Sequence, residues 1–251
     1  MAKSKIIKEL VNNEVSLTIA LRRLYVLAND IGNEEIKNWA DKEMNGYNKE
    51  DTLPDYRTFN SCELIYSGIN GRYQVTNQPL PRGFLTSQTI NRISTHNITA
   101  PLSEIEEYSK SKNSLGKDRT DLAGEVEKNS DNGLTSVQCF QIQQIIPAAQ
   151  FARITNAIYN VVLKSLIELE KVYGCLDELD IGSEKINKKD KDQLFESLNL
   201  IIGKQNIKMK NSNIGSGTNT SQKTTDVEIS PQISVSTEKK GKGFFKRFFK
   251  R

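Results

Sequence analysis

The stretch PAAQFARITNAIYNVVLKSLIELEKVYG, residues 147–174, decides the fold. Its apolar side chains recur at intervals of three and four residues, which is the spacing of one face of an α-helix. Pro147 suits the first turn of such a helix, and Gly174 suits its end. We therefore predict one long helix as the spine of the core, with an apolar stripe made of Phe151, Ile154, Ile158, Val161, Val162, Leu166, Leu169 and Tyr173.

Helical spacing also dominates the N-terminal part of the chain. Apolar residues between positions 5 and 28 indicate one long helix or two short ones, and Ser16 could cap the second. Gly32 ends this run, and Asn33 can cap a further helix. In that helix Trp39 has the spacing of a core residue, which favours packing over stacking on a ligand. We predict that the domain opens as a helical hairpin.

The spacing then changes to the alternation of a β-strand. Cys62, Leu64 and Tyr66 fall on one face of the first predicted strand. An Asn-Gly turn leads into a second strand, in which Tyr73 and Val75 can face the same core. These features predict a small β-hairpin.

Four further segments complete the predicted domain. A short helix is expected from residue 102 to about 108, a third strand at residues 136–142, and a final helix from 190 to about 202. Residues 109–133 are polar and are expected to form a mobile excursion. The predicted fold class is α+β, a mostly helical domain with a small antiparallel β-sheet.

Composition divides the chain into three parts. Residues 1–205 are predicted to be the helix-rich domain. Residues 206–240 are rich in Ser, Thr, Asn, Gly and Lys and are predicted to be a disordered polar linker, because they cannot bury enough apolar surface to offset chain ordering. Residues 241–251 form a basic amphipathic tail. Removing the seven cations of residues 239–251 from the net charge of +4 leaves −3 for residues 1–238, which argues against general nucleic-acid binding by the folded part.

The cysteines and the single histidine form no metal-binding pattern. Cys62, Cys139 and Cys175 are widely spaced and are expected to be reduced, partly buried thiols of a cytoplasmic protein. His96 lies in the polar stretch STHNIT and is expected at the surface. We predict neither a metal nor a cofactor. The N-terminus lacks the apolar run of a signal peptide, so a membrane is expected to be met only from its surface.

The tail, GKGFFKRFFKR, separates aromatic rings from cations with a helical period. At about 100° per residue the four rings share one arc, and Lys246, Arg247, Lys250 and Arg251 share the opposite one. Such a pattern favours an anionic membrane surface, with single-stranded nucleic acid as the alternative tail ligand, because rings stack on bases and cations follow phosphates. The predicted membrane-binding residues are Phe244, Phe245, Lys246, Arg247, Phe248, Phe249, Lys250 and Arg251.

A second group of residues could form a pocket or a structural motif. It consists of Glu43, Asn45, Tyr47, Asp55, Tyr56 and Arg57. These side chains could line a small-molecule or nucleotide pocket. We favour the structural interpretation, in which Arg57 pairs with a carboxylate and satisfies carbonyls at the end of a helix. No catalytic residue is predicted, and whether the protein is an enzyme stays open.

Several of these residues also fall in motifs shared with a known family. The motifs are Leu21-Arg22-Arg23, Leu27-Ala28, Trp39, Glu43-Met44-Asn45-Gly46-Tyr47 and Leu53-Pro54-Asp55-Tyr56-Arg57, followed by a strand ending near Gln143-Gln144 and a helix finishing Leu166-Ile167-Glu168-Leu169-Glu170. Over roughly residues 4–180 the chain resembles the AbiTii domain of bacterial abortive-infection and other conflict-system proteins. Met44 replaces a leucine of the family pattern. The resemblance implies a role in bacterial defence against phage or a related conflict, and it brings no established reaction or active site.

These observations lead to one functional hypothesis and one alternative. In the first, a sensing or interaction domain, with a protein partner or a second copy, is tethered to a tail that binds or perturbs the inner face of the cell membrane. The alternative is a nucleic-acid-binding or nucleotide-processing effector with its pocket around residues 43–57.

Overall fold

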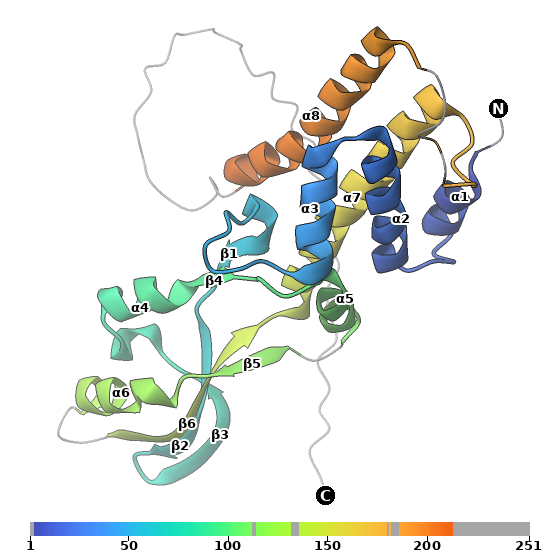
Figure 1. The fold of residues 1–251 in the computed structure, drawn as a ribbon. Coiled ribbons are helices and arrows are strands. Elements are labelled where there is room, and N and C mark those ends of the chain that lie inside the picture. Colours follow the sequence, from blue (N-terminus) through green and yellow to red (C-terminus); the bar gives the residue numbers. More distant parts are fainter. Residues whose placement is uncertain (1–2, 112–113, 132–135, 180, 182–185, 213–251) are drawn as a thin grey trace, which may run out of the picture. The chain divides into compact units, whose positions relative to one another are not determined.

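The computed structural model describes residues 3–111, 114–131, 136–179, 181 and 186–212, with side chains described as far as Gly203. Residues 213–240 of the predicted linker and the tail at 241–251 lie outside the described residues. Figure 1 traces the order of the elements along the chain.

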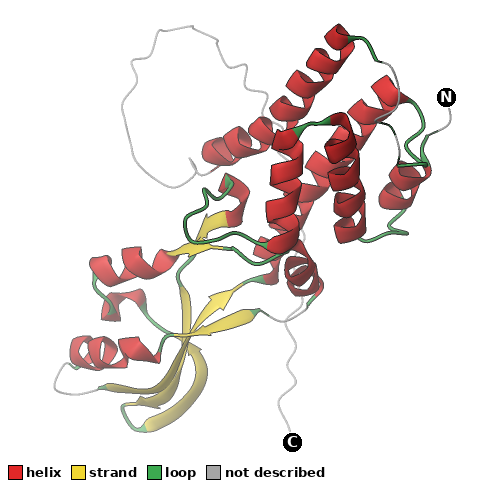
Figure 2. Cartoon of the chain, in the orientation of Figure 1, coloured by secondary structure: helices red, strands yellow, loops and turns green. Residues whose placement is uncertain are grey.

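Helices make up most of the described chain (Figure 2). They are α1 (Lys5–Val11), α2 (Leu17–Ile31), α3 (Glu34–Asn45), α4 (Ser87–Ser94), α5 (Leu102–Lys110), α6 (Ala123–Ser130), α7 (Ala148–Tyr173) and α8 (Lys188–Ser212), with the 3-10 turns η1 (Asp55–Arg57), η2 (Arg82–Phe84) and η3 (Thr120–Leu122). α8 continues past its predicted end and takes in residues 206–212, the first part of the predicted linker. Over the described ranges, none of the helices is both long enough and apolar enough to cross a membrane.

The strands form two antiparallel sheets. They are β1 (Thr58–Asn60), β2 (Glu63–Asn70), β3 (Tyr73–Pro79), β4 (Thr95–Asn97), β5 (Leu115–Asp118) and β6 (Val137–Ile146). β1 pairs with β4, and the larger sheet has the order β3-β2-β6-β5. The predicted α+β class, mostly helical with small antiparallel sheets, is confirmed.

The predicted helical spine is confirmed as α7. It starts after Pro147 and ends at Gly174, which has a φ of 80°. All eight residues of its predicted apolar stripe are buried in the main core. α2 and α5 pack on α7, and α2 and α3 form the predicted hairpin. Ser16 and Asn33 cap these two helices, accepting hydrogen bonds at 3.3 and 2.9 Å.

A second apolar cluster lies on one face of the four-stranded sheet. It joins the inward residues of β2 and β6, including Tyr66 and Ile142, to Ile93 of α4 and Val126 of α6. α4 and α6 therefore cover the same face of this sheet, as Figure 1 shows. The hairpin predicted around the Asn-Gly turn is present as β2 and β3.

The structure corrects three details of this region. The excursion predicted at 109–133 is wrong, because its described part forms β5, η3 and α6, and Leu122 and Val126 bury their side chains against the sheet. The third strand runs on to Ile146, past its predicted end. Tyr73 does not face the core but is 77% exposed and belongs to neither core cluster.

The prediction that His96 lies at the surface is also wrong. Its side chain is buried, its ring stacks on Phe59 at a centroid distance of 4.9 Å, and its Nε2 lies 3.0 Å from the carbonyl of Ser61. The polar residues around His96 are typical of a turn. In the structure this stretch forms β4, and its pairing with β1 places His96 in the interior. The three cysteines are free thiols, with Cys175 the exposed one.

Lys3 and Ser4 are joined to the end of α7 by Glu170. This carboxylate accepts hydrogen bonds from the backbone N–H and the hydroxyl of Ser4, at 2.5 and 2.7 Å, and from Lys3 Nζ at 2.5 Å. Burial works to raise the pKa of Glu170, but these donors outweigh burial and lower it below its ordinary value. Lys3 and Ser4 thereby become part of the fold.

Candidate functional site

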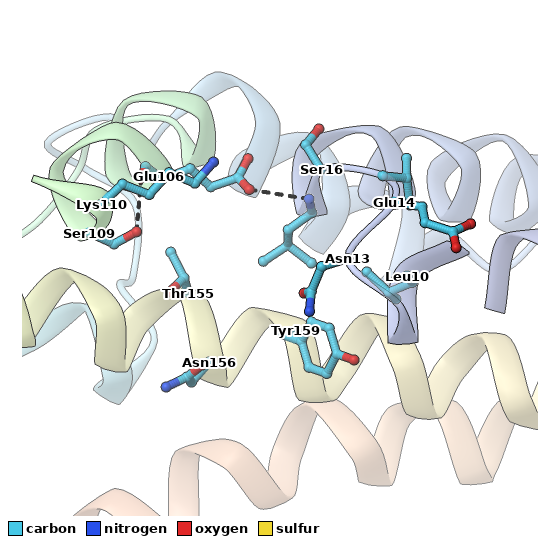
Figure 3. Close-up of a pocket in the computed structure, with 12 residues that line it drawn as sticks. Leu10, Asn13, Glu14, Ser16, Glu106, Ser109, Lys110, Thr155, Asn156 and Tyr159 are labelled. Atoms are coloured by element: carbon cyan, nitrogen blue, oxygen red, sulfur yellow. Dashed lines mark hydrogen bonds between the residues drawn. The ribbon is translucent and has the colours of Figure 1, made fainter. Parts of the chain in front are cut away.

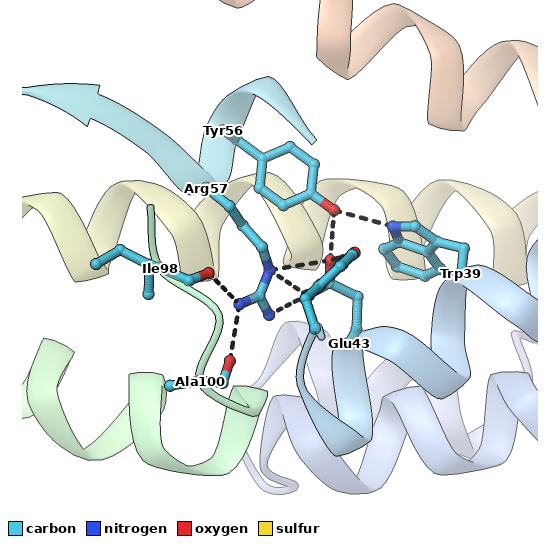
Figure 4. A network of polar contacts seen from close by, with 7 residues as sticks. Trp39, Glu43, Tyr56, Arg57, Ile98 and Ala100 are labelled. Carbon is cyan, nitrogen blue, oxygen red and sulfur yellow. Dashed lines mark hydrogen bonds and ion pairs between the residues drawn. The ribbon is translucent and has the colours of Figure 1, made fainter. Parts of the chain in front are cut away.

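Four of the six predicted site residues meet in one buried cluster (Figure 4). Glu43 lies near the end of α3, and Tyr56 and Arg57 belong to η1. Tyr47 follows Gly46, the residue that caps the end of α3. Trp39, one helical turn before Glu43, completes the group.

Glu43 is the acceptor at the centre of this cluster. Its Oε1 accepts hydrogen bonds from the Tyr47 and Tyr56 hydroxyls, both at 2.7 Å. Its Oε2 accepts from Arg57 Nη2 at 2.5 Å and from Arg57 Nε at 3.1 Å, which makes the ion pair bidentate. Trp39 Nε1 donates to the Tyr56 hydroxyl at 2.9 Å. Each buried polar group named here therefore has a partner.

Arg57 connects this centre to the loop before α5. Its Nη1 donates to the carbonyls of Ile98 and Ala100, at 3.0 and 2.7 Å. The predicted carboxylate partner is correct, but the carbonyls belong to this loop and not to the helix end. The guanidinium also lies 4.8 Å from the centre of the Tyr47 ring, at cation–π distance.

Gly46 brings the end of α3 against the same loop. Its φ of 86° and ψ of 174° belong to a region that essentially only glycine occupies. A Cβ at this position would lie 2.7 Å from the carbonyl oxygen of Thr99. The backbone N–H of Tyr47 donates to that same oxygen at 2.9 Å. The loop is thus held by Arg57 and by the backbone after α3.

Burial limits the chemistry that this cluster can perform. Glu43 and Arg57 have no exposed surface and Tyr56 has 1%. Burial, reinforced by the charge of Glu43, raises the pKa of both Tyr47 and Tyr56, so both phenols are neutral hydrogen-bond donors at physiological pH. As placed, the cluster joins α3, η1 and the loop before α5, and it offers no surface to a substrate.

The other two predicted site residues do not join the cluster. Asn45 is exposed and donates to Asp41 at 3.0 Å. Asp55 is partly exposed, and its buried Oδ2 has no hydrogen-bond partner. Sequence reasoning missed the loop carbonyls, since a backbone carbonyl has no residue signature. It could have found the role of Trp39 from its four-residue spacing to Glu43.

A hollow with a volume of about 390 Å³ lies elsewhere, between the α1–α2 turn, α5 and α7 (Figure 3). Its carboxylate Glu106 is engaged with the start of α2, where it accepts from the Thr18 hydroxyl at 2.5 Å. The hydroxyls of Ser16 and Ser109 are bonded to local backbone groups. No histidine or cysteine lines this hollow. Across the described ranges, no cluster of three or more metal-ligating side chains occurs.

Comparison with known proteins gives one match. No curated protein and no solved structure matches the chain. The family model of AbiTii matches residues 4–195, from before α1 into α8. This range includes the buried cluster and both sheets. The chain therefore belongs to the AbiTii family, and this membership indicates a role in bacterial abortive-infection defence.

Proposed function

We propose that this protein defends the bacterium by binding the anionic inner face of the cell membrane through residues 241–251. The folded domain receives the infection signal or partner. One observation carries the proposal, the segregation of four phenylalanines from four cations within residues 244–251. A flat interface between lipid tails and headgroups needs this segregation.

The tail has enough cations and rings for measurable membrane affinity. Each cation near an anionic leaflet contributes about 1 kcal/mol. Each phenylalanine contributes about 1.5–3 kcal/mol when fully buried, and less at an interface. A micromolar dissociation constant requires about 8 kcal/mol. The five cations and four rings of residues 241–251 exceed this value when the rings are fully buried.

Binding and folding of the tail are coupled in this proposal. A helix of eight residues falls below the roughly 12–15 residues that an isolated helix needs in water. The free-energy cost of ordering the tail as a helix is offset only when the phenylalanine rings leave water and enter the lipid. The tail therefore responds strongly to lipid composition and salt.

The folded domain contributes recognition and not a reaction. Its buried acid–guanidinium cluster supports the structural interpretation, because Glu43 and Arg57 are fully buried and bonded to each other. A nucleotide-processing site here would require α3 and η1 to separate. Residues 1–238 have a net charge of −3, which argues against general nucleic-acid binding by the folded part.

Single-stranded nucleic acid is the second candidate for the tail, because the same rings and cations could stack on bases and follow phosphates. The two candidates differ in what they require. Stacking on a flexible strand does not need rings and cations on opposite sides, whereas insertion into a lipid surface does. The sequence pattern therefore favours the membrane.

Vesicle flotation of the full-length protein tests the proposal. Wild type is expected to float with vesicles that contain phosphatidylglycerol and to remain at the bottom with neutral phosphatidylcholine. A variant with Phe244, Phe245, Phe248 and Phe249 replaced by serine keeps every charge and should lose at least tenfold in binding. Tyr73→Ser, which removes a 77% exposed ring from the folded domain, is the matched control and should float as wild type does.

Two outcomes would overturn the proposal. Equal flotation of wild type and the serine variant would show that the rings do not insert. Failure of wild type to float, together with tight binding to a fluorescent single-stranded oligonucleotide, would assign the tail to nucleic acid.

A further inference from the structure

The face of the four-stranded sheet opposite α4 and α6 has no partner in the described chain. Ile65, Ile69, Ile145 and Phe140 belong to neither core cluster. Ile65 and Ile69 alternate with the inward residues of β2, and Ile145 lies opposite Glu63 on the outward side of β6. Phe140 is 61% exposed.

A β-bulge places Phe140 on this face. Ser67 pairs with Gln141 and Gly68 with Cys139, so Phe140 is an extra residue between two paired positions. Gly68 permits the bulge, because a Cβ there would collide with the carbonyl of Gln138.

The polar residues of the open face are amides and not cations. Gln138, Gln141 and Gln143 of β6 share it with Gln74 of β3, which pairs with Ile69. The register puts two carboxylates, Glu63 and Asp118, at one end of the face and no lysine or arginine on it. A face without cations fits neither phosphates nor anionic lipid.

We propose that this open face is the surface through which a second copy of the chain binds. Amide side chains donate and accept hydrogen bonds, so a glutamine row is complementary to itself. In a two-fold arrangement with the strands of the two faces antiparallel, the acidic end of one face lies over the opposite end of the other, so their carboxylates do not meet. Face-to-face packing of two sheets at a spacing of about 10 Å buries the isoleucines and Phe140.

The size of the face fits a reversible dimer. β2 has eight residues and the sheet four strands. At about 3.4 Å per residue and about 4.8 Å between strands, the face measures roughly 27 by 19 Å. Two such faces cover on the order of 1,000 Å², which lies at the lower limit for a specific interface. The dimer should therefore depend on concentration.

Charge substitution at the centre of the face tests the proposal on the full-length protein. Sedimentation velocity over a range of concentrations should show a monomer–dimer equilibrium. Gln141→Lys and Gln141→Glu should each weaken dimerisation at least tenfold, because equal charges meet near a two-fold axis. Mixing the two variants should restore the dimer, since a lysine then meets a glutamate. Gln78→Lys is the control, because Gln78 is exposed on the same sheet but its register places it on the opposite face.

Thermal unfolding of each variant should match wild type, which separates loss of the interface from loss of the fold. A wild type that stays monomeric at every concentration would overturn the proposal. A dimer that both Gln141 variants leave intact would also overturn it, and sensitivity to Gln78→Lys alone would move the interface to the edge of β3.

Discussion

Replacing Arg57 by methionine removes the guanidinium from the buried cluster and keeps most of the side-chain volume. The change leaves the Glu43 carboxylate without its bidentate partner and leaves the carbonyls of Ile98 and Ala100 without their donors. Removing one partner of a buried ion pair lowers the free energy of unfolding by about 3–5 kcal/mol. Against a total stability of about 5–15 kcal/mol, this is a large loss.

Chemical denaturation followed by tryptophan fluorescence measures this loss directly. Trp39 is the only tryptophan, is 7% exposed, and donates to Tyr56 within the cluster. The double variant Glu43→Gln with Arg57→Met removes both charges and should recover part of the loss, because no uncompensated charge stays buried. Arg23→Met is the matched control. Its partner Glu9 lies at 3.1 Å but the pair is partly exposed, so the expected cost is about 0–1 kcal/mol.

If the free energy of unfolding of Arg57→Met lies within about 1 kcal/mol of that of wild type, the structural interpretation of the cluster is wrong. Such a result, combined with loss of protection against phage, would favour the alternative in which residues 43–57 form a functional pocket. Loss of folding together with loss of protection is the outcome that the structure predicts.

The remaining predictions concern backbone conformation and pH. Gly46→Ala should destabilise the domain by about 1–3 kcal/mol, because alanine is strained at this φ and ψ and its Cβ would meet a carbonyl. Gly203→Ala, in an open helical position, should be neutral or stabilise by up to about 1 kcal/mol in the same denaturation assay. The lowered pKa of Glu170 gives stability that is present above the ordinary carboxyl pKa and is lost as pH falls through the folded value. In denaturation between pH 7 and pH 3, Glu170→Gln should therefore show a weaker dependence of stability on pH than wild type, and an equal dependence would contradict the assignment.

Helices with strong periodicity and clear caps could be predicted from the sequence. The stripe of α7 and the caps Ser16 and Asn33 arise from local chemistry, and local chemistry is visible in a single chain. Elements that depend on tertiary pairing could not be predicted. His96 lies in a polar stretch whose strand exists only because β1 pairs with it, and η3 and α6 are held by two buried apolar residues, Leu122 and Val126, in a polar segment.

The same distinction between local and tertiary features applies to the candidate site. Four of its residues, Glu43, Tyr47, Tyr56 and Arg57, lie close in sequence and could be grouped by their complementary chemistry. The loop that Arg57 binds comes some forty residues later and contributes only backbone carbonyls. Because every residue has a carbonyl, no residue type indicates this contact. Asn45 illustrates the converse, because proximity in sequence on a helix does not mean a shared face.

We propose that segregation of rings from cations in residues 244–251 directs the protein to a membrane. The most direct test compares wild type with a full-length variant whose tail has the same composition but mixes phenylalanines and cations around the helix. Binding to phosphatidylglycerol vesicles is measured across a salt titration. The account predicts that wild type binds at least tenfold more tightly at every salt concentration, while both proteins weaken as salt rises. Equal binding of the two tails would contradict it, because charge alone would then explain the affinity.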